Sequence, residues 1–413
     1  MAVFKPFKAV RPKHNVADRV ISLPYDVMNR EEAYAMAEGN PLSFLRVTRA
    51  EIDLPSVVGD YDEAVYNRAK ENLDEFIRGE YFYKEDIPVF MIYKLTFAGN
   101  EQTGFVGCVS VDEYENGVVR RHELTRVEKE DDRSRHFDIC GANTEPVFLT
   151  YRSNEVLAHI IDEWVLTHDA DYSFKTAEGV GHTVWTVNDQ SAINKIRESF
   201  EAIERLYIAD GHHRSASAYK TGLSRRMKNP GYTGDEEYNF FMAVAFPHTE
   251  IRVFDYNRLI KDLAGKSKEE FIADISSCFN VKRVFSAGYN PEEEHEIGLY
   301  LGDFWYKLIA KKEIIPVNDI IGALDVNLLQ NNILGPILGI NDPRVDERLE
   351  FVGGIRGSAE LERRVHTDMA AAFALYPVSV SILLDAADKN MIMPPKSTWF
   401  EPKLGSGLFI HEI

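Results

Sequence analysis

The segment 207–218 constrains this chain more than any other, because it is typical of a strand, a tight turn and the start of a helix. Residues 205–209 form a short, mostly apolar run, and residues 215–227 have helical composition. Gly211 allows backbone angles in the turn that other residues avoid. Backbone N–H groups converge at such a helix start and attract anions, and Arg214 adds a two-pronged donor. We therefore expect an oxyanion, such as a nucleotide phosphate, at this turn.

A purely structural interpretation is that Asp210 caps the helix or pairs with Arg214, while the two histidines are ordinary surface groups. The density of ionisable residues favours a site instead, because Asp-Gly-His-His-Arg is poor material for a core or a loop. We expect Arg214 to face solvent and to clamp the phosphate. The expected ligand-binding residues of this segment are Gly211, His212, His213 and Arg214.

The charge balance excludes some partners. The 413 residues carry a formal net charge of −19, which argues against non-specific binding to nucleic acid or to an anionic membrane. The cysteines at positions 108, 140 and 278 are too far apart for a metal-finger spacing, so we expect reduced, buried side chains. No signal-peptide run and no stretch of about 20 apolar residues is present, and we expect a cytoplasmic protein.

Apolar spacing predicts a mixed α+β fold. Helices are expected over 61–78, 156–165 and 192–203, and a short helix is expected to open at Asn29 and to stop at Gly39. Strands are expected over 20–23, 44–48, 146–151 and 239–246, the last of them beside 205–209. A β-meander is expected to include 89–97 and 104–111. Composition changes near residue 250, so we expect one α+β region over 1–250 and a second over 251–413.

Three further polar segments lie where regular elements are expected to end. Asp26 follows a predicted strand, and Glu123 lies in the densely charged run 120–136, which is more often a solvated helix. The segment 393–403 is stiffened by prolines and offers donors for phosphate, although it is equally typical of a tail strapped onto a core. Its expected ligand-binding residues are Lys396, Ser397, Thr398 and Lys403. We expect Asp26, Glu123 and Lys396 to approach one pocket.

Several of these segments resemble a known family. The run 208–214, with Pro24-Tyr25-Asp26-Val27, Asn40-Pro41, Glu145-Pro146-Val147-Phe148 and the run 393–403, resembles the bacterial domain-of-unknown-function family 1015 from near the start to the last residues. The Asp-Gly-His-His-Arg run alone is similar to the nucleotide-phosphate motif of the ParB/sulfiredoxin-like superfamily, which includes free serine kinases, sulfiredoxins and CTP-dependent ParB proteins. That resemblance implies a ParB/sulfiredoxin-like core.

Among the chemistries considered, phosphoryl transfer fits these residues best, because it needs mainly positioning and charge neutralisation. The expected catalytic carboxylates are Asp26, Glu123 and Asp210, which could serve Mg²⁺ or the acceptor hydroxyl. We expect a kinase-like phosphotransferase that uses ATP, ADP or CTP and acts on serine or a similar hydroxyl-bearing metabolite. A regulator that binds a nucleotide or another anion without turnover is the alternative. A hydrolase is poorly supported, since no GxSxG motif is present.

Overall fold

The computed structural model describes residues 2–413, and the chain forms two compact units. Unit 1 comprises the residues up to Arg121, Thr125–Ile251 and Pro402–Ile413, and unit 2 comprises His122–Leu124 and Arg252–Glu401. The mixed α+β class expected from the sequence is confirmed. The expected region 251–413 is not continuous, because its last residues belong to unit 1. The ParB/sulfiredoxin-like core stays a prediction.

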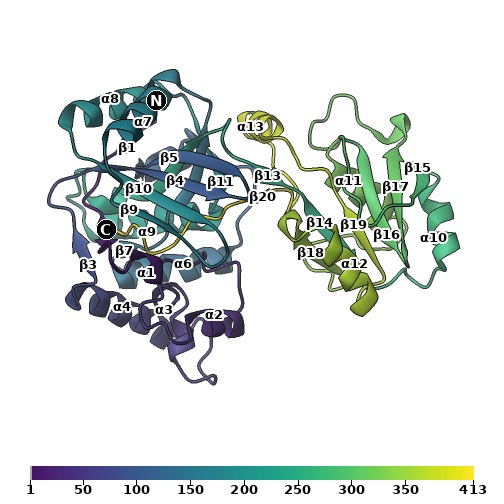
Figure 1. The fold of residues 1–413 in the computed structure, drawn as a ribbon, viewed down its shortest axis with the longest axis horizontal. Coiled ribbons are helices and arrows are strands. Elements are labelled where there is room, and N and C mark those ends of the chain that lie inside the picture. Colours follow the sequence, from purple (N-terminus) through teal and green to yellow (C-terminus); the bar gives the residue numbers. More distant parts are fainter. Residues whose placement is uncertain (1) are drawn as a thin grey trace. The chain divides into compact units, whose positions relative to one another are not determined.

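Unit 1 is built on a mixed sheet with the strand order β6-β11-β8-β12-β5-β4-β10-β9, and β1 pairs with β5 (Figure 1). β11 is parallel to β6, β12 is parallel to β8, and the other neighbours are antiparallel. The antiparallel run from β12 to β9 includes β4 and β5, the paired strands of the expected β-meander. The strands are β1 (Phe4–Lys5), β4 (Phe90–Phe97), β5 (Asn100–Ser110), β6 (Val119–Arg120), β8 (Val147–Tyr151), β9 (Tyr172–Lys175), β10 (Gly181–Val187), β11 (Leu206–Asp210) and β12 (Phe240–Pro247).

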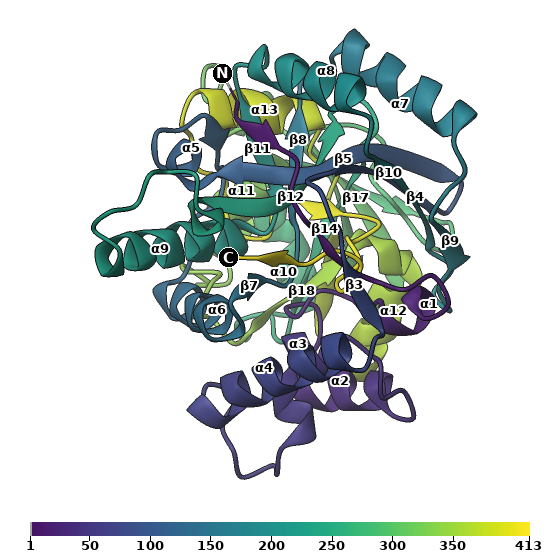
Figure 2. The ribbon, with the colours of Figure 1, turned by 90° about the vertical axis from the view of Figure 1, so that its left-hand side faces the viewer.

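Helices cover both faces of this sheet. α7 (Glu155–Thr167) and α8 (Gln190–Glu201) lie on one face, and α6 (Val127–Cys140) and α9 (His212–Lys228) lie on the other (Figure 2). The apolar sides of α7 and α8 are buried in the same core as the strands, which matches their helical spacing in the sequence. α5 (Val111–Glu115) packs against α9.

A smaller helical layer packs against α6. It consists of α1 (Ala17–Val20), α2 (Arg30–Ala37), α3 (Leu45–Thr48) and α4 (Glu63–Arg78), with β2 (Val10–Pro12) paired to β3 (Phe82–Lys84). α2 begins as expected, because the side chain of Asn29 accepts from the Glu32 N–H while the Glu32 side chain accepts from the Asn29 N–H.

Two strand predictions in this layer are wrong. Val20 ends α1, and residues 45–48 form α3. Val20, Phe44 and Val47 are fully buried in a core shared with α4. Short apolar runs are buried in either conformation, so their spacing does not separate strand from helix. The expected pairing of 239–246 with 205–209 is also wrong, because β8 lies between β11 and β12.

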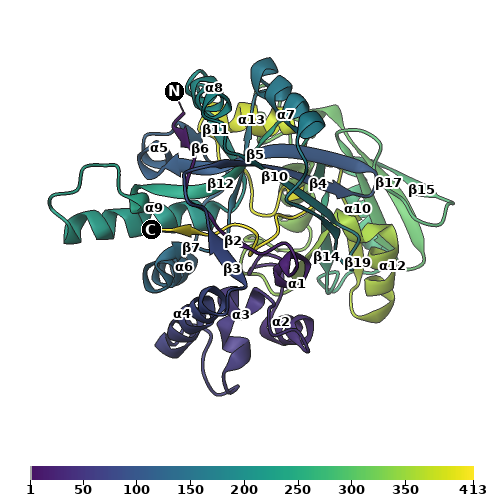
Figure 3. The same ribbon diagram turned by 60° about the vertical axis from the view of Figure 1, so that its left-hand side comes forward.

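The last residues of the chain are an integral part of unit 1 (Figure 3). Ile410 forms a bridge to Val10, Ser406 forms one to Ser22, and β21 (His411–Glu412) pairs with β7 (Ala142–Asn143). The side chains of Leu404, Leu408, Phe409 and Ile410 are buried. These pairings explain why this segment separates from the rest of the expected C-terminal region.

Unit 2 is built on an antiparallel sheet with the strand order β15-β17-β16-β19-β14-β18. The strands are β14 (Tyr256–Ile260), β15 (Phe279–Val284), β16 (Glu296–Leu301), β17 (Phe304–Ala310), β18 (Leu349–Gly353) and β19 (Ala371–Ala374). α12 (Gly357–Thr367) packs on β19, β16 and β14. The other helices are α10 (Lys268–Ile275), α11 (Asp325–Leu329) and α13 (Val380–Asp388), and β13 (Val253–Phe254) pairs with β20 (Trp399–Phe400).

Candidate functional site

The expected strand, turn and helix are present in unit 1. β11 ends at Asp210, Gly211 has a φ of +94°, and α9 begins at His212, earlier than the expected Ser215. A Cβ atom added at Gly211 would lie 2.9 Å from the Nε atom of Arg214, so the turn requires glycine for its angle and for space. Gly211 supplies no side-chain cap, which leaves the first N–H groups of α9 without one.

The position of Arg214 contradicts the expectation that this residue faces solvent and clamps a phosphate. Its side chain is only 2% exposed, and Nη1 donates to the carbonyl oxygen of Pro146. Nη2 lies 3.7 Å from Oδ2 of Asp210. Burial would lower the pKa of Arg214, but nearby carboxylates, Asp210 first among them, outweigh burial and raise it. The guanidinium therefore stabilises the turn from beneath instead of facing solvent.

Asp210 is held in its ionised form. Its Oδ1 accepts from the N–H of Gly211 at 2.8 Å, and its Oδ2 lies 3.3 Å from Nζ of Lys403. Burial opposes ionisation, but Lys403 and then Arg214 hold the pKa of Asp210 well below its usual range. A carboxylate of this kind is a poor proton acceptor. It orients the Lys403 ammonium, which the chain brings here from its last segment.

The two histidines have different surroundings. His212 is buried, whereas His213 is half-buried. Nε2 of His213 accepts from the N–H of Arg126 at 3.1 Å, so the ring proton is on Nδ1. Burial lowers the pKa of His213, although the charge of Asp26 opposes this effect. His213 is therefore a neutral, oriented donor at the start of α9.

A second carboxylate, Glu145, is buried and its charge acts on Arg214. Its Oε1 accepts from the Tyr25 N–H at 3.1 Å and from Oγ of Ser406 at 2.9 Å. Burial raises the pKa of Glu145, while Arg214 and Arg133 oppose it. Sequence reasoning assigned Glu145 no role. The usable signal is a charged residue placed directly before a proline and a fully buried strand.

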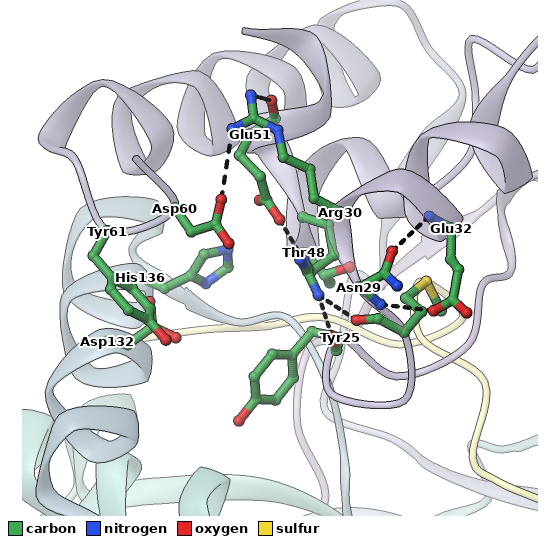
Figure 4. Close-up of polar contacts among 12 residues, drawn as sticks. Tyr25, Asn29, Arg30, Glu32, Thr48, Glu51, Asp60, Tyr61, Asp132 and His136 are labelled. Atoms are coloured by element: carbon green, nitrogen blue, oxygen red, sulfur yellow. Dashed lines mark hydrogen bonds and ion pairs between the residues drawn. The ribbon is translucent and has the colours of Figure 1, made fainter. Parts of the chain in front are cut away.

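Two arginines, the half-buried Arg49 and the buried Arg133, hold the loop that carries Asp26. Nη1 of Arg49 donates to the carbonyl oxygens of Tyr25 at 2.9 Å and Met28 at 2.7 Å, as Figure 4 shows around the labelled Tyr25. The guanidinium of Arg133 lies 4.2 Å from the centre of the Tyr25 ring. Arg133 is buried in α6, so this part of the charged run 120–136 is not the solvated helix face that we expected. Asp26 itself is exposed, and its charge acts on Arg214 and His213.

With this geometry in place, the family can be stated. Residues 4–327 match the family model described as a protein of unknown function, DUF1015. The chain belongs to the DUF1015 family. The match includes the site described above except for Lys403 and Ser406, and it does not reach the segment 393–403, which the sequence resemblance had included. No curated protein matches the sequence.

Some solved structures show weak similarity to this DUF1015 protein. A free serine kinase variant in complex with AMP has a TM-score of 0.35 and 12% identity, with 73% of this chain and 91% of that chain covered. SbnI with a C-terminal truncation, from Staphylococcus aureus, has a TM-score of 0.39 and 10% identity over 74% of this chain and 86% of that chain. A conserved hypothetical protein from Pyrococcus furiosus has a TM-score of 0.35 and 12% identity, with 73% and 94% covered.

The remaining expected site residues of the DUF1015 chain lie in unit 2. The N–H of Met393 donates to the carbonyl oxygen of His122 at 2.8 Å, so the segment of Glu123 and the segment 393–398 meet there. Ser397 is buried, with its Oγ donating to the carbonyl oxygen of Pro394, whereas Lys396 is exposed and Thr398 is half-buried. A single pocket shared by Asp26, Glu123 and Lys396 stays a prediction.

Neither a cluster of metal-binding side chains nor a membrane-spanning helix is present among the described residues. Within residues 2–413, no group of three or more histidine, cysteine, aspartate or glutamate side chains is arranged to hold a metal ion. In the same range, no helix has the length and apolar character needed to cross a membrane.

Proposed function

We propose that unit 1 binds a phosphate-bearing ligand at the start of α9 and acts as a nucleotide-dependent phosphotransferase on a small hydroxyl-bearing metabolite. The observation that carries this proposal is the orientation of His213. Because its Nε2 accepts from the Arg126 N–H, its Nδ1–H is an oriented donor on a residue of the first turn of α9. Helix dipole, backbone N–H groups and a neutral imidazole together favour an oxyanion.

The charged groups around this turn match the needs of phosphoryl transfer, which depends on positioning and on neutralising charge. Lys403, oriented by Asp210, would stabilise negative charge on the transferring group. Asp26 is an exposed carboxylate whose charge acts on both His213 and Arg214. It would accept the proton of the attacking hydroxyl. Asp210, with its lowered pKa, would serve as a positioning residue only.

The turn at Gly211 suits a nucleotide phosphate better than a metal ion bound directly by protein side chains. The uncapped start of α9 suits a phosphate. No three-ligand metal cluster exists among residues 2–413, so Mg²⁺ would be held mainly by phosphate oxygens and water. Bound Mg²⁺ would neutralise charge on the phosphates. Glu123, Lys396, Ser397 and Thr398 lie in unit 2, so the function proposed for unit 1 does not depend on them.

The test pairs ligand binding with product detection. Thermal unfolding of the full chain would be followed with ATP, ADP, CTP and inorganic phosphate, since a ligand of the native state raises the melting temperature. Phosphorus NMR with serine and other hydroxyl acceptors would report transfer. The proposal fails if none of these ligands raises the melting temperature.

Two substitutions of His213 test the hydrogen-bond donor at Nδ1 separately from the acceptor at Nε2. His213→Gln places an amide near Nε2 and loses the Nδ1 donor, so binding should weaken about tenfold, as expected for one hydrogen bond. His213→Asn keeps a donor near Nδ1 and should bind more tightly than His213→Gln. His159→Gln, at a histidine whose side chain is 79% exposed on α7, is the control. Equal binding by His213→Gln and the parent would place the ligand elsewhere.

The second candidate is an anion-binding regulator without turnover. It is favoured by Asp210, whose carboxylate is already engaged by Lys403 and Arg214. A rise in melting temperature with nucleotide, without any phosphorylated product, would support this candidate over the phosphotransferase.

A further inference from the structure

Arg258 is a buried cation in the unit 2 sheet, on the strand next to the edge strand β18. It lies on β14, between β18 and β19, and is 2% exposed. Its Nη1 donates to the carbonyl oxygen of Tyr256, and its Nη2 donates to that of Pro395 over 3.4 Å. The guanidinium carbon lies 4.9 Å from the centre of the Phe351 ring. The polar contacts of Arg258 are therefore with neutral carbonyl groups.

The other buried arginines of the chain have carboxylate partners. Arg11 lies 2.8 Å from Glu85, and Arg133 lies 2.9 Å from Asp132. Arg258 forms no ion pair with any residue of the described range 2–413. Burial lowers the pKa of Arg258 to about 9, and only the hydroxyl of Tyr256 opposes that effect.

A buried charge without a counter-ion is unfavourable, because it loses its hydration and gains no ion pair. Apolar residues of similar size usually replace such a group without loss of stability. The Nε atom of Arg258 has no acceptor among residues 2–413, and the Nη2 bond is long. Nε and Nη2 form one edge of the guanidinium, and that edge matches two oxygens of a phosphate or carboxylate group.

The segment 394–398 lies directly beside this edge. The carbonyl oxygen of Pro395 is the acceptor of Nη2, and Lys396 follows it with its Nζ 5.4 Å from the centre of the Tyr256 ring. Lys396 has a φ of +59°, a backbone angle that residues other than glycine, asparagine and aspartate rarely adopt. Backbone strain of this kind often accompanies a binding site.

We infer that Arg258 and the segment 394–398 form an oxyanion site in unit 2, which binds the phosphate or carboxylate group of a small ligand through the Nε/Nη2 edge of Arg258, with Lys396 as a second cation. Every residue of this site lies in unit 2, so the inference goes beyond the function proposed for unit 1. It also gives a role to the Pro-Pro-Lys-Ser-Thr segment, which lies outside the matched part of the family.

The experiment uses the full chain with His213→Gln in the background, so that binding at α9 is weakened and occurs only at higher anion concentration. Inorganic phosphate and acetate are titrated separately at constant ionic strength against chloride, and hydrogen exchange of β14 peptides reports the stability of unit 2. Protection of β14 should rise with one of the two anions. A response to phosphate identifies a phosphate-bearing ligand, and a response to acetate alone identifies a carboxylate.

Substitutions of Arg258 then separate a binding role from a structural one. Arg258→Met should leave β14 as protected as in the parent, or more so, in the absence of anion, and the response to anion should be lost. Arg258→Lys keeps the charge but not the two-pronged edge, so affinity should fall about tenfold. Lys282→Gln removes one exposed charge on β15 and should bind the anion as the parent does.

The inference is overturned if β14 shows no response to either anion. It is also overturned if Arg258→Met lowers protection while the response to anion persists, because Arg258 would then be a structural tie between β14 and Pro395. If Arg258→Met does not fold, undiminished anion affinity in Arg258→Lys has the same consequence.

Discussion

At the scale of single residues, neighbours in the Asp-Gly-His-His-Arg run have opposite surroundings. Arg214 points into the protein, while His213 stays half-buried at the start of α9. Successive residues on a helix differ in direction by about 100 degrees, so a dense polar segment cannot place all its side chains on one side. The sequence identifies the polar cluster, but the sheet beneath α9 decides which group meets a ligand.

Arg214→Lys should destabilise the chain. Lysine cannot maintain both the bond to the Pro146 carbonyl oxygen and the contact with Asp210, and the site is buried. Loss of a buried, charge-assisted hydrogen bond costs about 1.5–3 kcal/mol in the free energy of unfolding. Urea unfolding measures this loss in the free energy of unfolding. Arg197→Lys, at an exposed position on α8, should change stability by less than about 0.5 kcal/mol. Equal stability of the two variants would contradict the structural role of Arg214.

At the scale of elements, long periodic segments were predicted correctly and short apolar ones were not. The helix expected over 61–78 is α4, and Asn29 begins α2 through its side-chain cap. The runs 20–23 and 44–48 were assigned to strands because a run of four or five buried residues has no distinguishing period. Strand order was not predictable either, since β8 enters between β11 and β12 from a distant part of the sequence.

The C-terminal segment gives the prediction at this scale. Ile410 is fully buried and exchanges backbone hydrogen bonds with Val10. Ile410→Ala removes apolar contacts and leaves a cavity, so it should lower the free energy of unfolding of unit 1 by about 2–5 kcal/mol.

Glu412→Ala is the matched control, since it removes only an exposed ion pair with Lys84 from the same segment. Its effect should stay below about 1 kcal/mol. Urea unfolding followed by circular dichroism compares the two variants. A small effect of Ile410→Ala would mean that unit 1 is stable without its last segment.

At the scale of the whole molecule, the candidate site was predictable only in part. The sequence predicted Asp210, His213 and Lys403 as site residues, and the structure pairs Asp210 with Lys403. Ligand binding by these residues stays a prediction. It missed Glu145 and Arg258, because each is a single charged residue within or beside a buried apolar strand. Their roles depend on which carboxylates and carbonyl groups the fold places around them, and no local pattern contains that information.

Buried groups in the two units should contribute to the pH dependence of stability with opposite sign. Burial lowers the pKa values of His136 and His182 in unit 1 to about 3. The unfolded chain binds those protons near pH 6.5, so the contribution of these two histidines to the stability of unit 1 should fall as the pH decreases from about 6.5. Burial raises the pKa of Asp325 in unit 2 to about 7. The folded state binds that proton more tightly, so this contribution is complete near pH 4 and is lost as the pH rises to 7.

Asp325→Asn isolates the unit 2 contribution, because Oδ1 of Asp325 accepts from the His295 N–H at 2.8 Å and an amide oxygen can keep that bond without ionising. The parent should lose about 1.4 kcal/mol of unit 2 stability per pH unit between pH 5 and 7, and the variant should not. Above pH 7 the variant should therefore be the more stable protein.

Hydrogen exchange of β16 and β14 peptides measures unit 2, and β4 peptides measure unit 1. Asp303→Asn, at a side chain that is 81% exposed, should behave as the parent does. A pH slope in unit 2 that survives Asp325→Asn would show that other groups of unit 2 bind the proton.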